Sequence, residues 1–160
     1  MSQSQIIFWR SDDAQNRSLK FFFNAFLAYH CYDKRGASAM IIIDLEWNSG
    51  SDYSGFDEIL QIGAVRISAP GGCILDTFNV HVRPCVNTTL HPAAAILPEL
   101  WHSFADGVCF PVAFLKFREW ARHEKDYAAW GEDDFRVLQQ NVSFWNLPPL
   151  SIRAAFNLQR

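Results

Sequence analysis

Apolar runs of strand length dominate the chain from Met40 onward and predict a sheet. The first of them, 40–47, is apolar at most positions, which is typical of a central strand. The segment 58–68 predicts a second strand, and a glycine pair follows it as a turn. Alternation of apolar and polar residues in 73–84 predicts a third strand. Short connections between three successive strands indicate an antiparallel meander.

Helical spacing becomes the stronger signal after the third strand. The proline-punctuated segment 91–104 predicts one short helix, and 110–123 predicts a longer one whose aromatic residues recur every three positions. The segment 126–131 predicts a short strand, 133–142 a helix with acidic residues in its first turn, and 154–160 a last strand or helix. We therefore predict an α/β fold with a mixed sheet, in which the three-strand meander is joined by parallel strands and flanked by helices.

Composition narrows the possible functions only modestly. With 160 residues, 49% of them hydrophobic, the chain can form one globular domain with a core. The formal charge of −3 gives no general attraction to phosphate backbones, although an enzyme that grips only a strand end through metal ions needs none. Four cysteines without C-x-x-C spacing are expected to be reduced thiols, which predicts a cytoplasmic protein. No run approaches the roughly 18 apolar residues of a membrane span, so no membrane partner is expected.

Two carboxylates interrupt the most apolar run of the chain. Asp44 and Glu46 lie two residues apart in the predicted strand 40–47, so both should project from the same face of the sheet. Their repulsion would be relieved by a hydrated edge or by a divalent cation, and oxygen ligands suit Mg²⁺ or Mn²⁺. The pair alone is a weak signal, because many exposed strands carry such a pattern.

A second acidic cluster strengthens the case for a site. In "AAWGEDDF" a predicted strand ends at Gly131 and a helix starts near Asp134. Strand ends and helix starts gather on one rim of an α/β sheet, where sites usually form. The alternative interpretation is that Asp133 and Asp134 are plain helix caps.

Together these segments resemble the DEDD 3′–5′ exonucleases of the DEDDh type. The resemblance rests on "MIIIDLEWN", "FDEILQIGAV", "DTFNVHVRP", "LHP" and "WGEDDFRVLQQN", in the family's order and approximate spacing, and it is clearest to bacterial sporulation-inhibitor-like and Eri1-like enzymes. It covers 40–160, which it identifies as an exonuclease domain of ribonuclease H-like fold, C-terminally truncated. Residues 1–39 form an N-terminal extension outside the pattern, and helical spacing in 18–29 predicts a short helix there.

The resemblance implies a chemistry and a set of site residues. Family members remove nucleotides from the 3′ end of RNA or single-stranded DNA by a mechanism that uses two divalent cations, Mg²⁺ or Mn²⁺. Asp44, Glu46 and Asp134 match the catalytic, metal-holding positions, and the spacing after the glycine selects Asp134 over Asp133. Adjacency alone suggests Leu45, Trp47 and Asn48 as substrate-contacting residues.

One family motif has no counterpart in this sequence. The resemblance implies a histidine followed five residues later by an aspartate, well beyond Asp134, and no histidine follows that position. His30 and Asp33 are three apart, and the other histidines are expected to have packing, hydrogen-bonding or surface roles. The chain could therefore be a truncated enzyme, an inactive relative, or a subunit whose site another subunit completes. The alternative to an exonuclease is a catalytically inactive module that binds nucleic acid or protein.

Overall fold

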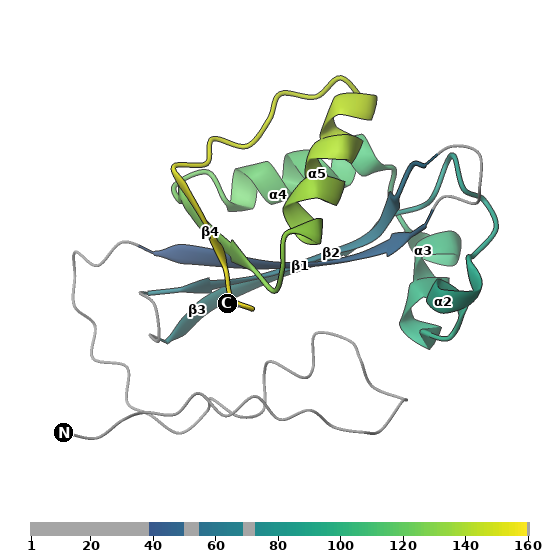
Figure 1. The fold of residues 1–160 in the computed structure, drawn as a ribbon, viewed down its shortest axis with the longest axis horizontal. Coiled ribbons are helices and arrows are strands. Elements are labelled where there is room, and N and C mark those ends of the chain that lie inside the picture. The colour runs from purple at the N-terminus through teal and green to yellow at the C-terminus, as the bar shows by residue number, and fades with distance from the viewer. Residues whose placement is uncertain (1–38, 50–54, 69–72, 160) are drawn as a thin grey trace.

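A single mixed sheet covered by helices forms the described part of the molecule. The computed structural model describes residues 39–49, 55–68 and 73–159. Figure 1 shows the chain passing through the following elements: β1 (Met40–Asn48), β2 (Glu58–Ile67), β3 (Ile74–His81), α2 (Pro92–Ala95), the 3₁₀ helix η1 (Pro98–Leu100), α3 (Trp101–Asp106), α4 (Phe110–Trp120), β4 (Asp126–Ala129), α5 (Asp133–Phe144) and β5 (Ala154–Asn157).

The sheet combines an antiparallel half and a parallel half. Its strand order is β3-β2-β1-β4-β5. The pairs β1–β2 and β2–β3 are antiparallel, as the predicted meander requires. The pairs β1–β4 and β4–β5 are parallel, so these three strands end at the same edge of the sheet. The predicted mixed α/β fold is confirmed.

The main core lies between the sheet and the helices α4 and α5. Both helices stand on one side of the sheet (Figure 1). From β1, Ile41, Ile43 and Leu45 point to this side, and Phe114 and Phe117 of α4 meet them without any exposed surface. Burying aromatic and branched side chains of this size contributes about 1.5–3 kcal/mol each. The core therefore fixes β1, and with it the direction of the acidic side chains.

The opposite face of β1 carries a small apolar cluster and then the two carboxylates. Met40 and Ile42 pack with Val65 and Ala128 near the start of the strand. Because side chains alternate along a strand, Asp44 continues this same face beyond Ile42. On this face the strand thus carries apolar residues near its start and acidic residues toward its C-terminal end.

Several predicted elements are shorter or divided in the structure, and two of these differences have a clear cause. The segment 91–104 predicted one helix but forms α2, η1 and α3, because Pro98 has no N–H to continue a helix. The third strand ends at His81, three residues early, because Val82 makes its bridge to Val108 and the next N–H, of Arg83, donates to the same Val108 carbonyl.

The remaining expectations concern the segment 18–29, the cysteines and membrane-spanning helices. The predicted helix at 18–29 lies outside the described residues. Cys85 and Cys109 are free thiols as expected. Cys73 is disulfide-bonded, so the expectation of four reduced thiols is wrong; scattered spacing carried no information about pairing. In the part of the chain that the structure describes, no helix has both the length and the apolar character to cross a bilayer.

Candidate active site

The two acidic clusters meet where the parallel strands β1 and β4 end. Their register runs from Ile41 beside Tyr127 to Ile43 beside Ala129, after which β4 stops. Gly131 then adopts a φ of 141°, a conformation that L side chains rarely adopt, and the chain turns directly into α5. This turn brings the first residues of α5 against β1, next to the position of Asp44.

Beyond Ile43, β1 no longer pairs with β4 on this side, and the side chain of Asp134 takes over as hydrogen-bond acceptor for β1. Its carboxylate oxygen Oδ1 accepts a hydrogen bond of 2.9 Å from the backbone N–H of Leu45. Asp134 is only 8% exposed although it is in the first turn of a helix. The alternative of a plain helix cap does not describe it, because the N-cap residue is Glu132 and makes no side-chain capping bond.

Electrostatics couple Asp44 to Asp134. Burial, and secondly the charge of Asp134, raise the pKa of Asp44 from 3.8 to about 6. Burial also raises the pKa of Asp134, with a smaller contribution from Asp133, while hydrogen bonds from the backbone of Leu45 and of Asp134 itself act against the increase. The protein therefore holds two carboxylates close together in a partly dehydrated place, which destabilises their charged forms.

Glu46 completes the predicted acidic set only in part. It lies on the Asp44 side of β1 by strand alternation, opposite Gln61, and the register shifts directly after it. Among the described residues, no group of three or more His, Cys, Asp or Glu side chains is positioned to hold one metal ion. The structure thus brings Asp44 and Asp134 together but does not gather Asp44, Glu46 and Asp134 into one ligand set.

The donor chemistry of the Asp44–Asp134 pair nevertheless fits a hard divalent cation. Both side chains offer carboxylate oxygens, which Mg²⁺ and Mn²⁺ prefer. A cation between them would remove the repulsion that raises the pKa of Asp44. The residues that could hold a metal here are Asp44 and Asp134, with Glu46 beside them on the same strand.

The three residues suggested as substrate contacts occupy different environments. Leu45 is 2% exposed and belongs to the main core. Asn48 has no exposed surface: its amide nitrogen donates to the carbonyls of Asn87 and Thr89, both at 2.9 Å, and its oxygen accepts the N–H of His91 at 2.7 Å. Such burial leaves Leu45 and Asn48 no side-chain surface for a substrate, whereas Trp47 is partly exposed.

A buried carboxylate that sequence reasoning missed works together with Asn48. Glu58, opposite Asn48 in the β1–β2 pair, is 3% exposed. Its two oxygens accept the backbone N–H groups of residues 85–87 at 2.6–3.1 Å. The Asn48–Glu58 pair therefore fastens the loop 85–91 to the end of β1. The available signal was an acidic residue next to the apolar run "ILQIGAV", the same kind of signal that singled out Asp44.

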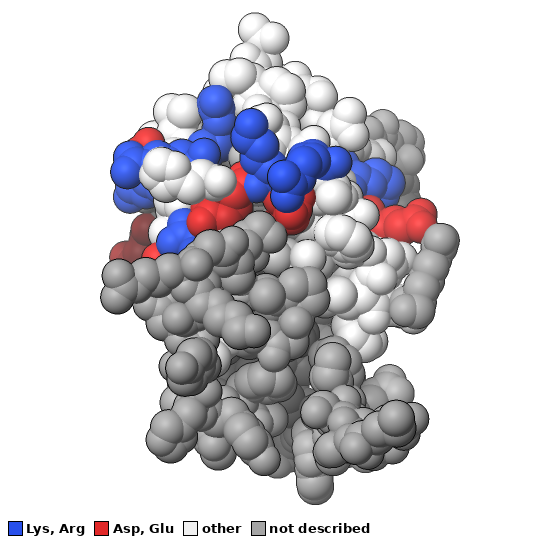
Figure 2. Space-filling view, turned by 90° about the vertical axis from the view of Figure 1, so that its left-hand side faces the viewer, with Lys and Arg blue, Asp and Glu red and all other residues white. Residues whose placement is uncertain are grey.

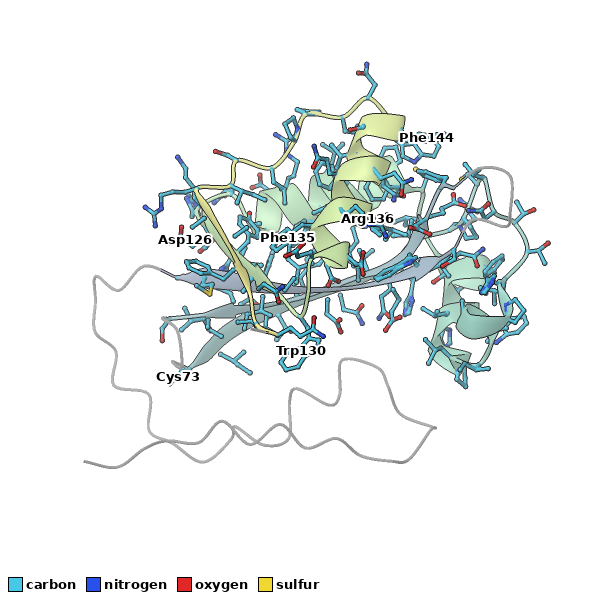
Figure 3. All side chains as sticks on the ribbon, in the orientation of Figure 1. Cys73, Asp126, Trp130, Phe135, Arg136 and Phe144 are labelled. Atoms are coloured by element: carbon cyan, nitrogen blue, oxygen red, sulfur yellow. The ribbon has the colours of Figure 1, made fainter. Side chains whose placement is uncertain are left out.

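Helix α5 is held in place by contacts with the segment that leads into β2. Arg136 forms an ion pair with Asp57 at 3.0 Å, and Gln140 donates to the carbonyl of Gly55 at 2.8 Å. Fully buried Asn141 accepts the N–H of Ile59 and donates to the carbonyl of Asp57. Arg136 lies on the side of α5 that faces this segment (Figure 3). These bonds fix the orientation of α5 and hence of Asp134.

The basic residues gather away from the acidic pair. Figure 2 shows Lys and Arg in a band across the end of the molecule where α4 finishes and β4 begins. A cavity of about 400 Å³ at this end is lined by residues that include Arg118, Arg122 and Lys125. This band lies where the parallel strands begin, whereas the candidate site lies where they end. The basic cavity and the candidate site are therefore at opposite ends of the parallel strands.

Comparison with known proteins gives matches of structure alone. No protein-family profile and no curated protein matches the sequence. The nuclease domain of 3′hExo, described as a DEDDh family member bound to rAMP, is 22% identical with a TM-score of 0.58, over 73% of this chain and 65% of that one. The chain has the fold of a DEDDh exonuclease. The predicted ribonuclease H-like fold is thereby confirmed.

Two further solved structures of nucleases are similar in fold to this chain. Cell-death related nuclease 4 is 21% identical with a TM-score of 0.58, over 69% of this chain and 41% of that one. The ExoI/SSB-Ct complex is 14% identical with a TM-score of 0.60, over 76% of this chain and 28% of that one. This chain therefore spans less than two thirds of the length of each of these structures, and at such identities the likeness is one of fold.

Proposed function

We propose that this protein is a metal-dependent 3′–5′ exonuclease that hydrolyses phosphodiester bonds at the end of RNA or single-stranded DNA. The observation that carries the proposal is the meeting of Asp44 and Asp134, from segments 90 residues apart, at the C-terminal edge of an exonuclease-like sheet. Ligands of open α/β sheets usually bind at this edge. A bound cation would offset the repulsion between the two charged carboxylates.

Each side chain has a distinct part in the proposed chemistry. Asp44 and Asp134 would hold the cation, and Glu46 lies on the same face of β1 as Asp44. Asp134 is also oriented by the N–H of Leu45. When bound, two Mg²⁺ or Mn²⁺ ions would stabilise the attacking water and the leaving 3′ oxygen of an in-line displacement. The Asn48–Glu58 pair fastens the loop 85–91 to the end of β1, beyond Glu46.

The fold neighbours and the charge distribution support the proposed substrate class. One neighbour is described as a 3′-exonuclease in 3′-end specific recognition of histone mRNA stem-loop, and another as Exonuclease I with an oligonucleotide. Because the site of this chain is acidic, a phosphate can approach only through bound cations. Recognition of a strand end by metal ions needs no basic surface around it.

A shortening assay tests the proposal. A 5′-labelled single-stranded RNA and the matching DNA are incubated with the protein and Mn²⁺ or Mg²⁺, and products are resolved by length. We expect stepwise loss from the 3′ end that disappears in EDTA and in Asp44→Asn. The assay is run at enzyme concentrations comparable to substrate, so that slow turnover is also detected. Exposed Asp106→Asn is the matched control and should shorten the substrate at the wild-type rate.

A non-catalytic binding module is the competing function. It is favoured by the absence of a complete three-residue ligand group among the described side chains. Binding of labelled RNA without any metal-dependent shortening, at enzyme concentrations comparable to substrate, would support the module and contradict the exonuclease proposal.

A further inference from the structure

The basic cavity at the end of the molecule where β4 begins is walled by one face of α4. This cavity of about 400 Å³ is lined by residues spaced three or four apart along the helix and the turn that follows it: Leu115, Arg118, Glu119 and Arg122. Residues at this spacing project from the same side of a helix. Lys125, directly before β4, lines this cavity and also a second one of about 170 Å³. The basic end of the molecule (Figure 2) is thus hollowed.

Positive charge is in excess in this cavity. Each of its two carboxylates already has an arginine partner: Glu119 pairs with Arg122, and Glu124 pairs with Arg66. Arg118 and Lys125 also line the cavity, and among the described residues neither has an ion-pair partner. Two cationic side chains therefore remain for an anion from outside the chain, although the chain as a whole carries a formal charge of −3.

The end of α4 does not need these two cations as caps. Basic side chains near a helix C-terminus often bind the last carbonyl groups of the helix. In α4 the carbonyl of Phe117 accepts the N–H of Ala121 at 2.8 Å. The carbonyl of Trp120 accepts a hydrogen bond from the guanidinium of Arg66. Capping therefore does not explain the two cations.

Apolar side chains lie beside these cations. Leu115 is 52% exposed, and it lines the cavity together with Leu150 and the buried Tyr127. A surface that combines cations with apolar side chains suits a ligand in which anionic groups alternate with flat apolar ones. Single-stranded nucleic acids have this chemistry, because each nucleotide joins a phosphate to a base.

Strand β4 separates the cavity from the acidic pair. Lys125 comes directly before this strand, and the turn that leads to Asp134 comes directly after it. The four residues of β4 span about 13 Å at about 3.3 Å each. The rise per nucleotide is about 3.4 Å in helical DNA and greater in an extended strand. A dinucleotide bound at the acidic pair therefore does not reach the cavity, whereas a longer strand does.

We propose that the cavity lined by Arg118 and Lys125 binds the phosphate backbone of a single-stranded nucleic acid upstream of its 3′ end. The inference rests on the proposed function, which places that 3′ end at Asp44 and Asp134. Each of the two cations would neutralise one phosphate, and Leu115 would contact a sugar or base. Such contacts hold the strand without selecting its sequence, since every nucleotide carries the same phosphate. They also supply affinity that the acidic pair lacks.

The salt dependence of binding tests the cavity independently of catalysis. Binding of a 5′-fluorescent RNA of about ten nucleotides, long enough at about 3.4 Å per nucleotide to span β4, is measured by anisotropy in EDTA at several salt concentrations. EDTA removes the metal and so prevents hydrolysis. The wild type is compared with the double variant Arg118→Gln/Lys125→Gln and with Arg118→Lys, which keeps the charge. Lys116→Gln is the matched control, because Lys116 is exposed on α4 but does not line the cavity.

The expected result is a change of slope. Each phosphate contact on a single strand contributes about −0.7 to the slope of log K against log salt concentration, so the magnitude of the slope should fall by about 1.4 in the double variant. Between about 50 and about 200 mM salt, the affinity of the double variant should therefore fall about 7-fold less than that of the wild type. Arg118→Lys and Lys116→Gln should keep the wild-type slope. With Mn²⁺ present, the double variant should have a lower kcat/KM for the long RNA and an unchanged kcat/KM for a dinucleotide.

Failure of the cavity and failure of the nuclease are distinguishable. An unchanged slope in the double variant, or an equal change in Lys116→Gln, overturns the cavity even when metal-dependent shortening is observed. Displacement of the RNA by polyglutamate of equal charge as readily as by unlabelled RNA overturns the assignment to nucleic acid. An equal loss of kcat/KM for the dinucleotide overturns the upstream placement. The expected slopes in a protein that never shortens RNA would support the cavity as a backbone-binding surface and overturn the exonuclease proposal.

Discussion

The most informative single substitution is Asp44→Asn, studied for its effect on stability instead of activity. It removes one charge from the acidic pair and keeps the size and shape of the side chain. In metal-free protein near neutral pH the folded state holds charged Asp44 in a partly buried place beside Asp134. We therefore expect the Asn variant to be more stable than the wild type, the reverse of the usual effect of a substitution.

The magnitude follows from the shift of one pKa. Asp44 has a pKa of about 6 in the folded protein and 3.8 as the reference for the unfolded chain. Between these values the folded state binds more protons, so stability falls as pH rises through this window, and the loss is complete above it. At about 1.36 kcal/mol per unit the cost of the charge is at most about 3 kcal/mol. For a chain of this length that is about 6–12 °C in Tm.

The assay is urea or thermal unfolding in EDTA across the pH range that contains both pKa values. The difference in unfolding free energy between Asp44→Asn and wild type should be near zero at the acid end, grow as pH passes the window, and then level off. Exposed Asp106→Asn is the control for removing a surface carboxylate. Adding Mg²⁺ or Mn²⁺ should stabilise the wild type and leave the Asn variant unchanged, which reverses their order.

Two results would refute this reasoning. If Asp44→Asn is less stable than the wild type at neutral pH in EDTA, then the charge of Asp44 is not destabilising in the folded state. If the stability difference is independent of pH, then the difference arises from packing and not from the proton on Asp44.

Further predictions concern the groups that position the site. Asp134→Ala should be less stable than Asp134→Asn by about 1–3 kcal/mol in urea unfolding, since only the amide can still accept the N–H of Leu45; equal stabilities would mean that this bond contributes nothing. Asn48→Ala should loosen the loop 85–91, seen as faster amide hydrogen exchange in that loop; unchanged protection would contradict its fastening role. Gly107→Ala should cost at least about 1–3 kcal/mol, because a Cβ there would lie 2.3 Å from the carbonyl oxygen of Ser103; a wild-type Tm would show that the close approach is absent in solution.

Much of the sheet could be predicted from the sequence because burial patterns act locally. The runs that form β1, β2 and β4 are apolar enough to specify buried strands, and helix α4 carries Phe114 and Phe117 at helical spacing. The order of strands in the parallel half was not contained in these patterns. This order depends on how the chain crosses between distant strands. The crossings are determined by the packing of α4 and α5 on one face of the sheet.

Site residues could be predicted from the sequence only where they depart from the pattern of the residues around them. Asp44 interrupts an apolar run, and Asp134 follows a strand-ending glycine, so both attract attention in the sequence. The burial of Asn48 and the fastening role of Glu58 were not predictable, since each depends on the path of a loop that begins 27 or more residues later. Nor could the spacing of Asp44 and Glu46 show that the two residues do not form a three-carboxylate ligand group with Asp134.

The bond between Asp134 and the N–H of Leu45 separates two aspartates that a nuclease would need equally. Asp134 stabilises the framework whether or not any chemistry occurs, whereas charged Asp44 is tolerated at a thermodynamic penalty. In descendants of this protein that had lost activity, position 44 should drift to neutral residues first, while an aspartate at 134 could persist for structural reasons alone. Survival of the second aspartate is therefore poor evidence of a working enzyme, and survival of the first is much better evidence.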